Sequence, residues 1–165
     1  MKLLISDTNI FIDLIELDLL DLFLSLEYEI KTTGFVINEL DVKKQRKIKE
    51  AAGNNKLEIL NTDFKGLEKI NSLSEKHRSL SLTDCSVLFF SQILKGSVIT
   101  GDGALRKIAQ ANGLEVSGIL WVFDEFEKTG TMGVKMLGQK FKKLTEINKR
   151  LPKIECETRL RKWGR

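Results

Sequence analysis

Four acidic residues lie where strands end or within helical segments in the pattern of this chain. Asp7 follows the apolar run at the N-terminus, and Asp102 follows another such run. Asp84 opens a segment with helical spacing, and Glu39 lies inside another. Clustered carboxylates repel one another, and Mg²⁺ or Mn²⁺ relieves that repulsion because both ions prefer oxygen ligands. Two such ions about 4 Å apart stabilise an in-line displacement at phosphorus. The acids therefore indicate a metal site for phosphodiester chemistry.

Each acid also has a purely structural explanation, and these alternatives stay open at the level of sequence. Asp7 and Asp102 could each cap the helix that follows it, and Asp84 could close a capping box. Glu39 could form an ion pair on the helix surface with a lysine one turn further on. The combination of all four acids favours a shared function. Two of them end strands and two lie in helices, and all four can meet at one edge of a sheet.

Five short apolar runs predict strands, and segments with helical spacing separate them. The strands are expected at 2–6, 28–33, 57–60, 97–100 and 114–117. The helices are expected at 10–26 (as one or two), from about 33 through Glu39 to about 52, at 64–76, from 82, at 104–111, and from 118 to about 149 with a break at 130–133. This alternation predicts an α/β fold, a three-layer α/β/α sandwich around a parallel sheet of about five strands. If the first and fourth strands are neighbours, Asp7 and Asp102 face one crevice.

The charge of the chain is concentrated at one end. The net charge is +4, but residues 135–165 hold 11 Lys/Arg and only 3 Asp/Glu. A basic end on an acidic body favours a polyanionic partner, although a solvated terminus has the same composition.

The remaining composition excludes several classes of protein. Two cysteines, Cys85 and Cys156, form neither a disulfide framework nor a zinc site. Asp7 interrupts the first apolar run too early for a signal peptide. The segment 10–26 is apolar at 12 of 17 positions, but it is too short and too charged to span a bilayer. We therefore expect a cytoplasmic protein with no membrane partner.

Four short motifs together resemble the PIN domain family, many bacterial members of which are VapC-type toxins. The motifs are Asp-Thr-Asn at 7–9, Asn-Glu-Leu at 38–40, Leu-Thr-Asp at 82–84 and Thr-Gly-Asp at 100–102, supported by the stretches at 104–109 and 118–121. The resemblance covers about residues 1–125. It implies a PIN-like nuclease domain at 1–130, followed by a basic, mostly helical extension at 131–165 that packs on the domain or trails from it.

The resemblance implies a metal-dependent endoribonuclease that hydrolyses RNA with one or two Mg²⁺ or Mn²⁺ ions. By motif, the catalytic and metal-binding residues would be Asp7, Glu39, Asp84 and Asp102. Some family members carry a fifth acid just after the last one. Here that stretch reads Gly-Ala-Leu at 103–105, so a second ion would have fewer ligands.

Other residues would orient the site or hold the RNA. Asn9 matches the family's polar position beside the first acid and Thr100 matches its hydroxyl position before the last, and the resemblance implies a positioning role for both. The candidates for phosphate contacts are Lys43, Lys44, Arg46, Lys47, Lys142 and Lys143. Trp163 could stack on a base, but docking onto the body of the protein is the more common role for such a residue. The expected partners are an RNA substrate, an antitoxin protein and a second copy of the chain in a homodimer.

Three alternatives compete with this interpretation. A catalytically silent PIN-like module would bind RNA or protein through its basic end. A phospho-receiver domain would place its acceptor near Asp63, but Asp7 lacks the paired acid that such a domain needs. An aspartate-nucleophile phosphatase would need a second Asp at position 9, where Asn9 stands.

Overall fold

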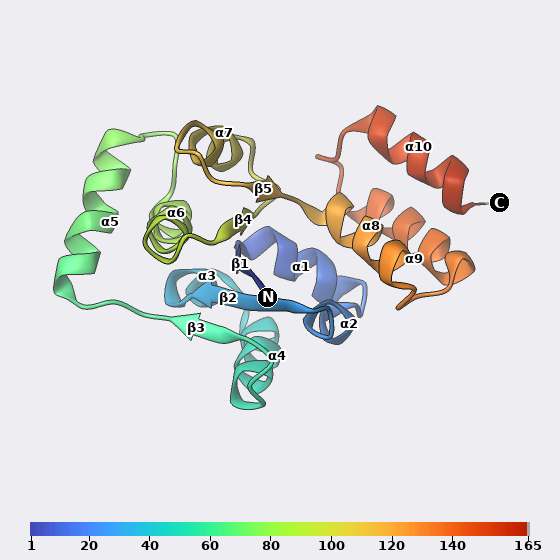
Figure 1. Ribbon diagram of the computed structural model, residues 1–165, viewed down its shortest axis with the longest axis horizontal. Coiled ribbons are helices and arrows are strands. Elements are labelled where there is room, and N and C mark those ends of the chain that lie inside the picture. The colour runs from blue at the N-terminus through green and yellow to red at the C-terminus, as the bar shows by residue number, and fades with distance from the viewer. Residues whose placement is uncertain (165) are drawn as a thin grey trace.

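A single parallel sheet of five strands organises the molecule. The computed structural model describes residues 1–164. The strands are β1 (Lys2–Ser6), β2 (Tyr28–Thr33), β3 (Glu58–Leu60), β4 (Ser97–Ile99) and β5 (Val116–Ser117), in the order β3-β2-β1-β4-β5 (Figure 1). The expected α/β/α sandwich is confirmed. The first and fourth strands are neighbours, with Ile5 beside Val98 in the register, so their carboxyl ends share one edge.

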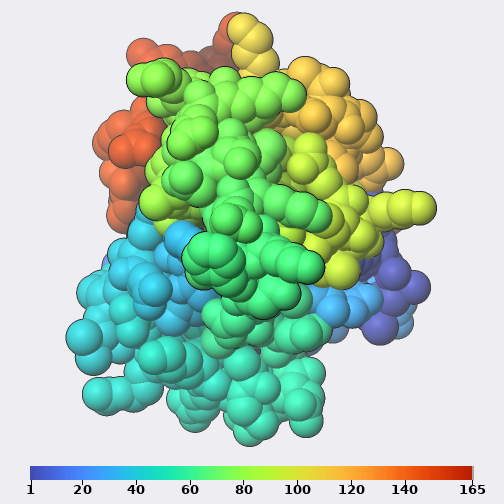
Figure 2. Space-filling view, turned by 90° about the vertical axis from the view of Figure 1, so that its left-hand side faces the viewer, coloured from blue at the N-terminus to red at the C-terminus, as the bar shows by residue number. Residues whose placement is uncertain are grey.

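Helices connect the strands and continue beyond the last one. They are α1 (Thr8–Glu16), α2 (Leu20–Leu24), α3 (Gly34–Glu39), α4 (Val42–Gly53), α5 (Phe64–Lys76), α6 (Leu82–Leu94), α7 (Gly103–Ala111), α8 (Ile119–Thr129), α9 (Val134–Ile147) and α10 (Lys153–Trp163). Helix α6 packs on β1, β2 and β4. Helices α8 to α10 gather at one end of the molecule and α5 lies at the other, where it crosses the surface (Figures 1 and 2).

The predicted helix from about residue 33 to residue 52 is two helices, which corrects that expectation. Leu40 is buried and has extended backbone angles, with φ −78° and ψ 148°. Asp41 then starts α4, because its side chain accepts a hydrogen bond of 2.9 Å from the Lys44 amide. Burial of Leu40 and the cap at Asp41 together end α3 at Glu39.

The C-terminal helices pack firmly on α8. Trp163 is only 2% exposed, and its ring lies 6.2 Å from that of Phe123 and 5.1 Å from that of Phe141. The Arg159 guanidinium donates to both oxygens of Asp124, at 2.9 and 2.6 Å. Docking of Trp163 onto the body, the expected role, is therefore what the structure shows.

Close approach of α9 and α10 depends on one glycine. A Cβ atom added at Gly138 would lie 2.4 Å from the carbonyl oxygen of Trp163. Any side chain there would push the two helices apart.

None of the helices formed by residues 1–164 is both long and apolar enough to cross a bilayer.

Replacing Trp163 with alanine should destabilise the whole protein, because the indole fills the space between α8 and α9. We expect a loss of about 3–5 kcal/mol in the free energy of unfolding, measured by urea denaturation followed by circular dichroism. The matched control is Ile154→Ala in the same helix, where the side chain is 79% exposed and the change should stay within about 0.5 kcal/mol. Equal stability of the two variants would show that α10 is not part of the cooperative core.

Candidate active site

Asp7 is the most buried of the four acids and stands directly after β1. Its side chain is 3% exposed. The carboxylate accepts hydrogen bonds from the Thr8 amide at 2.8 Å, from the Thr100 hydroxyl at 2.7 Å and from the Asn9 side-chain amide at 3.4 Å. Thus Asp7 caps α1, as its structural explanation required, and is also held by a side chain from the neighbouring strand.

Thr100 and Asn9 join the ends of β1 and β4. The Thr100 hydroxyl, which donates to Asp7, accepts a hydrogen bond of 3.0 Å from the Asp102 amide. The Asn9 side-chain oxygen accepts one of 2.9 Å from the Gly101 amide. Asn9 and Thr100, the residues expected to have a positioning role, therefore both contact Asp7, and each also contacts the segment that carries Asp102.

Glu39 reaches the same region from the last position of α3. Its carboxylate accepts a hydrogen bond of 2.9 Å from the hydroxyl of Thr8, whose amide donates to Asp7. The ion pair suggested for Glu39 with Lys43 is not present in the described chain, because α3 ends at Glu39 and no longer holds Lys43 one turn away.

Asp84 and Asp102 both cap helices, so their structural explanations are correct. Asp84 and Ser81 form a capping box, with distances of 2.9 and 3.0 Å. Asp102 accepts from the Leu105 amide at 2.8 Å. Within residues 1–164, however, the second oxygen of each carboxylate, Asp84 Oδ1 and Asp102 Oδ2, accepts no hydrogen bond. Each acid thus combines a cap with one oxygen that remains available as a ligand.

The four acids interact electrostatically. The pKa of Asp7 is raised to about 6, chiefly by burial; the charges of Asp84 and Glu39 act in the same direction, and the hydrogen bonds from Thr100 and Thr8 act against them. Burial also raises the pKa of Asp84, and the charges of Asp102 and Glu39 act in the same direction. Mutual repulsion of this kind is what a cation relieves.

The side chains are not already arranged around one point. Among the described residues, no three acidic, histidine or cysteine side chains lie close enough together to hold a metal ion as they stand. The possible ligand atoms nevertheless fit a hard cation, because all of them are carboxylate oxygens. Two of these oxygens, Asp84 Oδ1 and Asp102 Oδ2, accept no hydrogen bond within residues 1–164. Coordination of one ion by three or more of these acids would therefore require some of their side chains to move.

The basic residues expected to hold RNA lie apart from the large cavity beside the site. Lys43, Arg46 and Lys47 are exposed on α4, and Lys142 and Lys143 are exposed on α9. Lys44 is occupied by ion pairs with Asp41 at 2.7 Å and Glu16 at 3.0 Å. None of the six lines the cavity of about 860 Å³ that opens beside Asn9 and Thr100.

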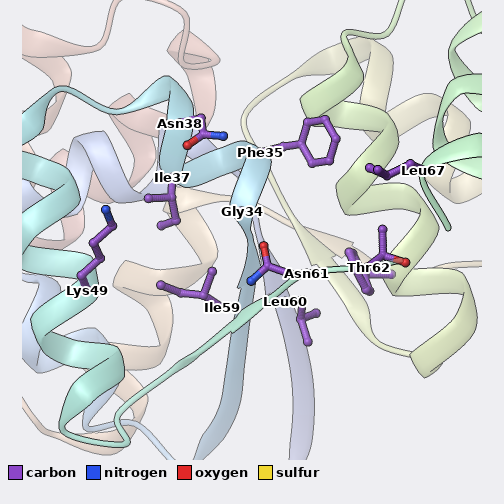
Figure 3. A pocket seen from close by; sticks show the side chains of 11 residues that line it. Gly34, Phe35, Ile37, Asn38, Lys49, Ile59, Leu60, Asn61, Thr62 and Leu67 are labelled. Carbon is purple, nitrogen blue, oxygen red and sulfur yellow. The ribbon is translucent and has the colours of Figure 1, made fainter. Parts of the chain in front are cut away.

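A smaller cavity of about 440 Å³ lies past the ends of β2 and β3. Figure 3 shows Asn38 and Phe35 from α3 on one side of it and Asn61 and Thr62, from the segment after β3, on the other. None of the four acids lines this cavity, so it does not belong to the site described above.

Sequence reasoning missed Thr8, the residue that links two of the acids. Its hydroxyl contacts Glu39 and its amide contacts Asp7. The sequence did carry a signal for Thr8: its hydroxyl side chain lies between Asp7 and Asn9 in the Asp-Thr-Asn motif.

Asp63 plays no part in the site. Its side chain caps α5 through the Gly66 amide at 2.9 Å, and the residue is exposed. The acceptor expected for a phospho-receiver domain is thus an ordinary helix cap.

Removing the charge of Asp7 should stabilise the metal-free protein near neutral pH. Because the native pKa of about 6 lies above the ordinary 3.8, the native state binds more protons than the unfolded state between these values, and stability falls as pH rises through them. At pH 7 in EDTA we expect Asp7→Asn to be more stable than wild type by up to roughly 3 kcal/mol, with the difference vanishing near pH 4. Urea denaturation of both proteins between pH 4 and pH 7 measures this difference in the free energy of unfolding.

The matched control is Asp18→Asn, at an exposed position. It should change stability little at any pH in the range. If Asp7→Asn changes the free energy of unfolding as little as this control does, the pKa of the Asp7 carboxyl is not raised in the native state.

Comparison with known proteins agrees with the fold. A family model described as a PIN domain (DUF3368) matches residues 3–165, so the match runs through the C-terminal helices that the sequence motifs did not cover. No curated protein matches the chain.

Two solved structures are similar at low identity. VapBC2 from Rickettsia felis, bound to a DNA fragment from its promoter, has 15% identity and a TM-score of 0.47, over 70% of this chain and 98% of that one. VapBC-1 from nontypeable Haemophilus influenzae has 11% identity and a TM-score of 0.49, over 71% and 98%. Likeness at this level says nothing about substrates or partners. The match of the family model over nearly the whole chain shows that the chain belongs to the PIN domain family.

Proposed function

We propose that this chain is a metal-dependent endoribonuclease that hydrolyses phosphodiester bonds in RNA. The observation that carries the proposal is the environment of Asp7, which is buried, has a pKa raised to about 6 and is repelled by the charges of Asp84 and Glu39. A raised carboxyl pKa costs stability at neutral pH, and perturbed carboxylates of this kind are common at functional sites. Membership of the PIN domain family supports the same conclusion.

Mg²⁺ or Mn²⁺, as one or two ions, would be held by Asp7, Glu39, Asp84 and Asp102. When bound, the ion supplies positive charge that stabilises the developing negative charge on the phosphate. The chain's own contribution is to hold the donors: Thr100 and Asn9 fix the Asp7 carboxylate, and Thr8 fixes that of Glu39. Such supporting contacts typically affect metal affinity or activity 10- to 100-fold.

The stretch after Asp102 offers no further ligand. Leu105 is fully buried, and Gly103 and Ala104 carry no side-chain oxygen. A second ion would therefore share the donors of the first, or take oxygens from the substrate.

We further propose a biological role as the toxin of a toxin–antitoxin pair, with an antitoxin protein as partner and a homodimer as the assembly. The support is the resemblance to VapC-type toxins described above.

A catalytically silent PIN-like module that binds RNA or protein is the second candidate. One observation favours it: in the described chain no three potential ligands are already placed around one point. The module would bind its partner without cleaving it, which the following measurements distinguish.

Cleavage of RNA in the presence of Mn²⁺ tests the catalytic assignment directly. Wild type should cut a structured RNA that contains unpaired loops, while Asp7→Asn and Asp102→Asn should be slower by about 100-fold or more, since each removes a charge that the transition state needs. The control is Asp18→Asn, with the same chemical change at an exposed position. Equal activity of wild type and both site variants, including equal inactivity, would sink the assignment.

Metal binding can be tested without catalysis. Mn²⁺ at about 100 times its dissociation constant should stabilise wild type by roughly 2.7 kcal/mol, which is a rise of about 5–10 °C in melting temperature for a domain of this size. Asp7→Asn should lose the rise, because it removes the central ligand, and Asp18→Asn should keep it. A rise of the same size in all three proteins would place the ion elsewhere.

A further inference from the structure

The large cavity beside Asp7 is built partly by the C-terminal segment. Its volume is about 860 Å³. Its lining includes Asn9, Thr100 and Gly101 at the carboxyl edge of the sheet and the loop between α9 and α10. Asn9 and Thr100 are the two residues that hold the Asp7 carboxylate, so the cavity begins where the acid site ends.

Three cations in the cavity lining have no ion-pair partner among residues 1–164: Arg106, Lys149 and Arg150. Arg159 also lines the cavity but is neutralised by Asp124. The lining also holds two other acids, Asp13 and Glu155. Asp13 is buried and hydrogen-bonded, and it is near enough to Arg150 for the two charges to interact. Glu155 is thus the one exposed acid of the described lining, beside exposed Lys149 and Arg150, so the exposed lining carries more positive than negative charge.

The loop that carries two of these cations is fixed in place. The Asn148 side-chain amide donates to the buried Asp13 carboxylate on α1 at 2.8 Å. The Arg150 amide donates back to the Asn148 side-chain oxygen at 3.1 Å. Lys149 and Arg150 are therefore presented from a loop that is tied to the same helix that Asp7 caps.

Arg106 is placed at the junction between the cavity and the acid site. Its Nη2 atom donates to the Thr100 carbonyl at 3.4 Å. A Cβ atom at Gly118 would come within 3.1 Å of this guanidinium group, so the glycine leaves room for it. The Arg106 guanidinium therefore lies at the end of β4, beside Thr100, whose hydroxyl donates to the Asp7 carboxylate.

The size and lining of the cavity match unpaired nucleotides. A volume of about 860 Å³ is in the range of about 300–1,000 Å³ that encloses a small ligand, and it is too small for a duplex. Trp121 lines the cavity, and an aromatic ring of this kind can stack on a base of any sequence.

We propose that this cavity binds the unpaired nucleotides of an RNA strand next to the phosphate that is cleaved. Arg106, Lys149 and Arg150 contact the phosphates, and Trp121 faces a base. The proposal rests on the function proposed above and adds to it the place where the substrate strand is held, together with the role of the C-terminal segment.

The test is binding of a fluorescent single-stranded RNA of about twelve nucleotides, within the usual site sizes, to the full chain in EDTA. Lys149→Gln/Arg150→Gln should bind at least tenfold more weakly than wild type. The dependence of log affinity on log salt should also become shallower by about 1.4, because each phosphate contact to a single strand contributes about 0.7. The control, Lys135→Gln/Lys153→Gln, loses the same charge from the same segment at exposed positions outside the cavity. It should stay within twofold of wild type.

All three proteins should melt at the same temperature, since the four changed side chains are exposed. The single variant Lys149→Gln provides the test if the double variant does not fold. Equal weakening of the cavity variant and the control, no binding of RNA by wild type, or equally strong binding of a duplex of the same length would each overturn the proposal.

Cleavage of the same RNA with Mn²⁺ separates this proposal from the proposed function. If wild type binds the RNA as described but never cleaves it, the catalytic assignment fails and the cavity proposal stands. If wild type cleaves, and Lys149→Gln/Arg150→Gln binds and cleaves with the KM of the control, the cavity proposal fails and the catalytic assignment stands. Agreement with both proposals requires a raised KM in the cavity variant with little change in kcat.

Discussion

The hydrogen bond between the Thr100 hydroxyl and the Asp7 carboxylate is the contact on which the rest of the site depends. It joins two strands that are far apart in the sequence, and it holds a carboxylate where water cannot solvate it. A buried charge without such donors is very costly. Because Thr100 also accepts from the Asp102 amide, one hydroxyl sets the position of two of the four acids. The strand order β2-β1-β4 is what makes this contact possible.

The same acids that indicate chemistry also perform structural work. Asp7, Asp84 and Asp102 each cap a helix, so the functional and structural explanations of these residues are not exclusive. A cap orients a carboxylate by tying one oxygen to the backbone, and in Asp84 and Asp102 the other oxygen is left without a hydrogen bond. Helix caps at the carboxyl edge of a parallel sheet thus bring acids to the same side of the sheet, even though no three of them surround one point in the described residues.

The fold could be predicted from sequence because its signals are local, whereas the site depends on contacts that are not. The bounds of β2 and α5 agree with the ranges expected from sequence, 28–33 and 64–76. The break after Glu39 was missed, since no glycine or proline marks it: it arises from burial of Leu40 together with the cap at Asp41. Likewise the acids could be chosen by motif, but the bridge through Thr8 and the cavity wall at Asn148 need the packed chain.

Helix α1 connects the two halves of the proposed RNA site. Asp7 caps its first turn, and Asp13, six residues later, holds the loop that carries Lys149 and Arg150. Six residues of helix span about 9 Å, and a helix cannot stretch. If the nucleotides occupy the cavity, α1 fixes the distance between the acid site and the bound base. The scissile phosphate then lies a fixed number of nucleotides from that base, whatever the RNA sequence is.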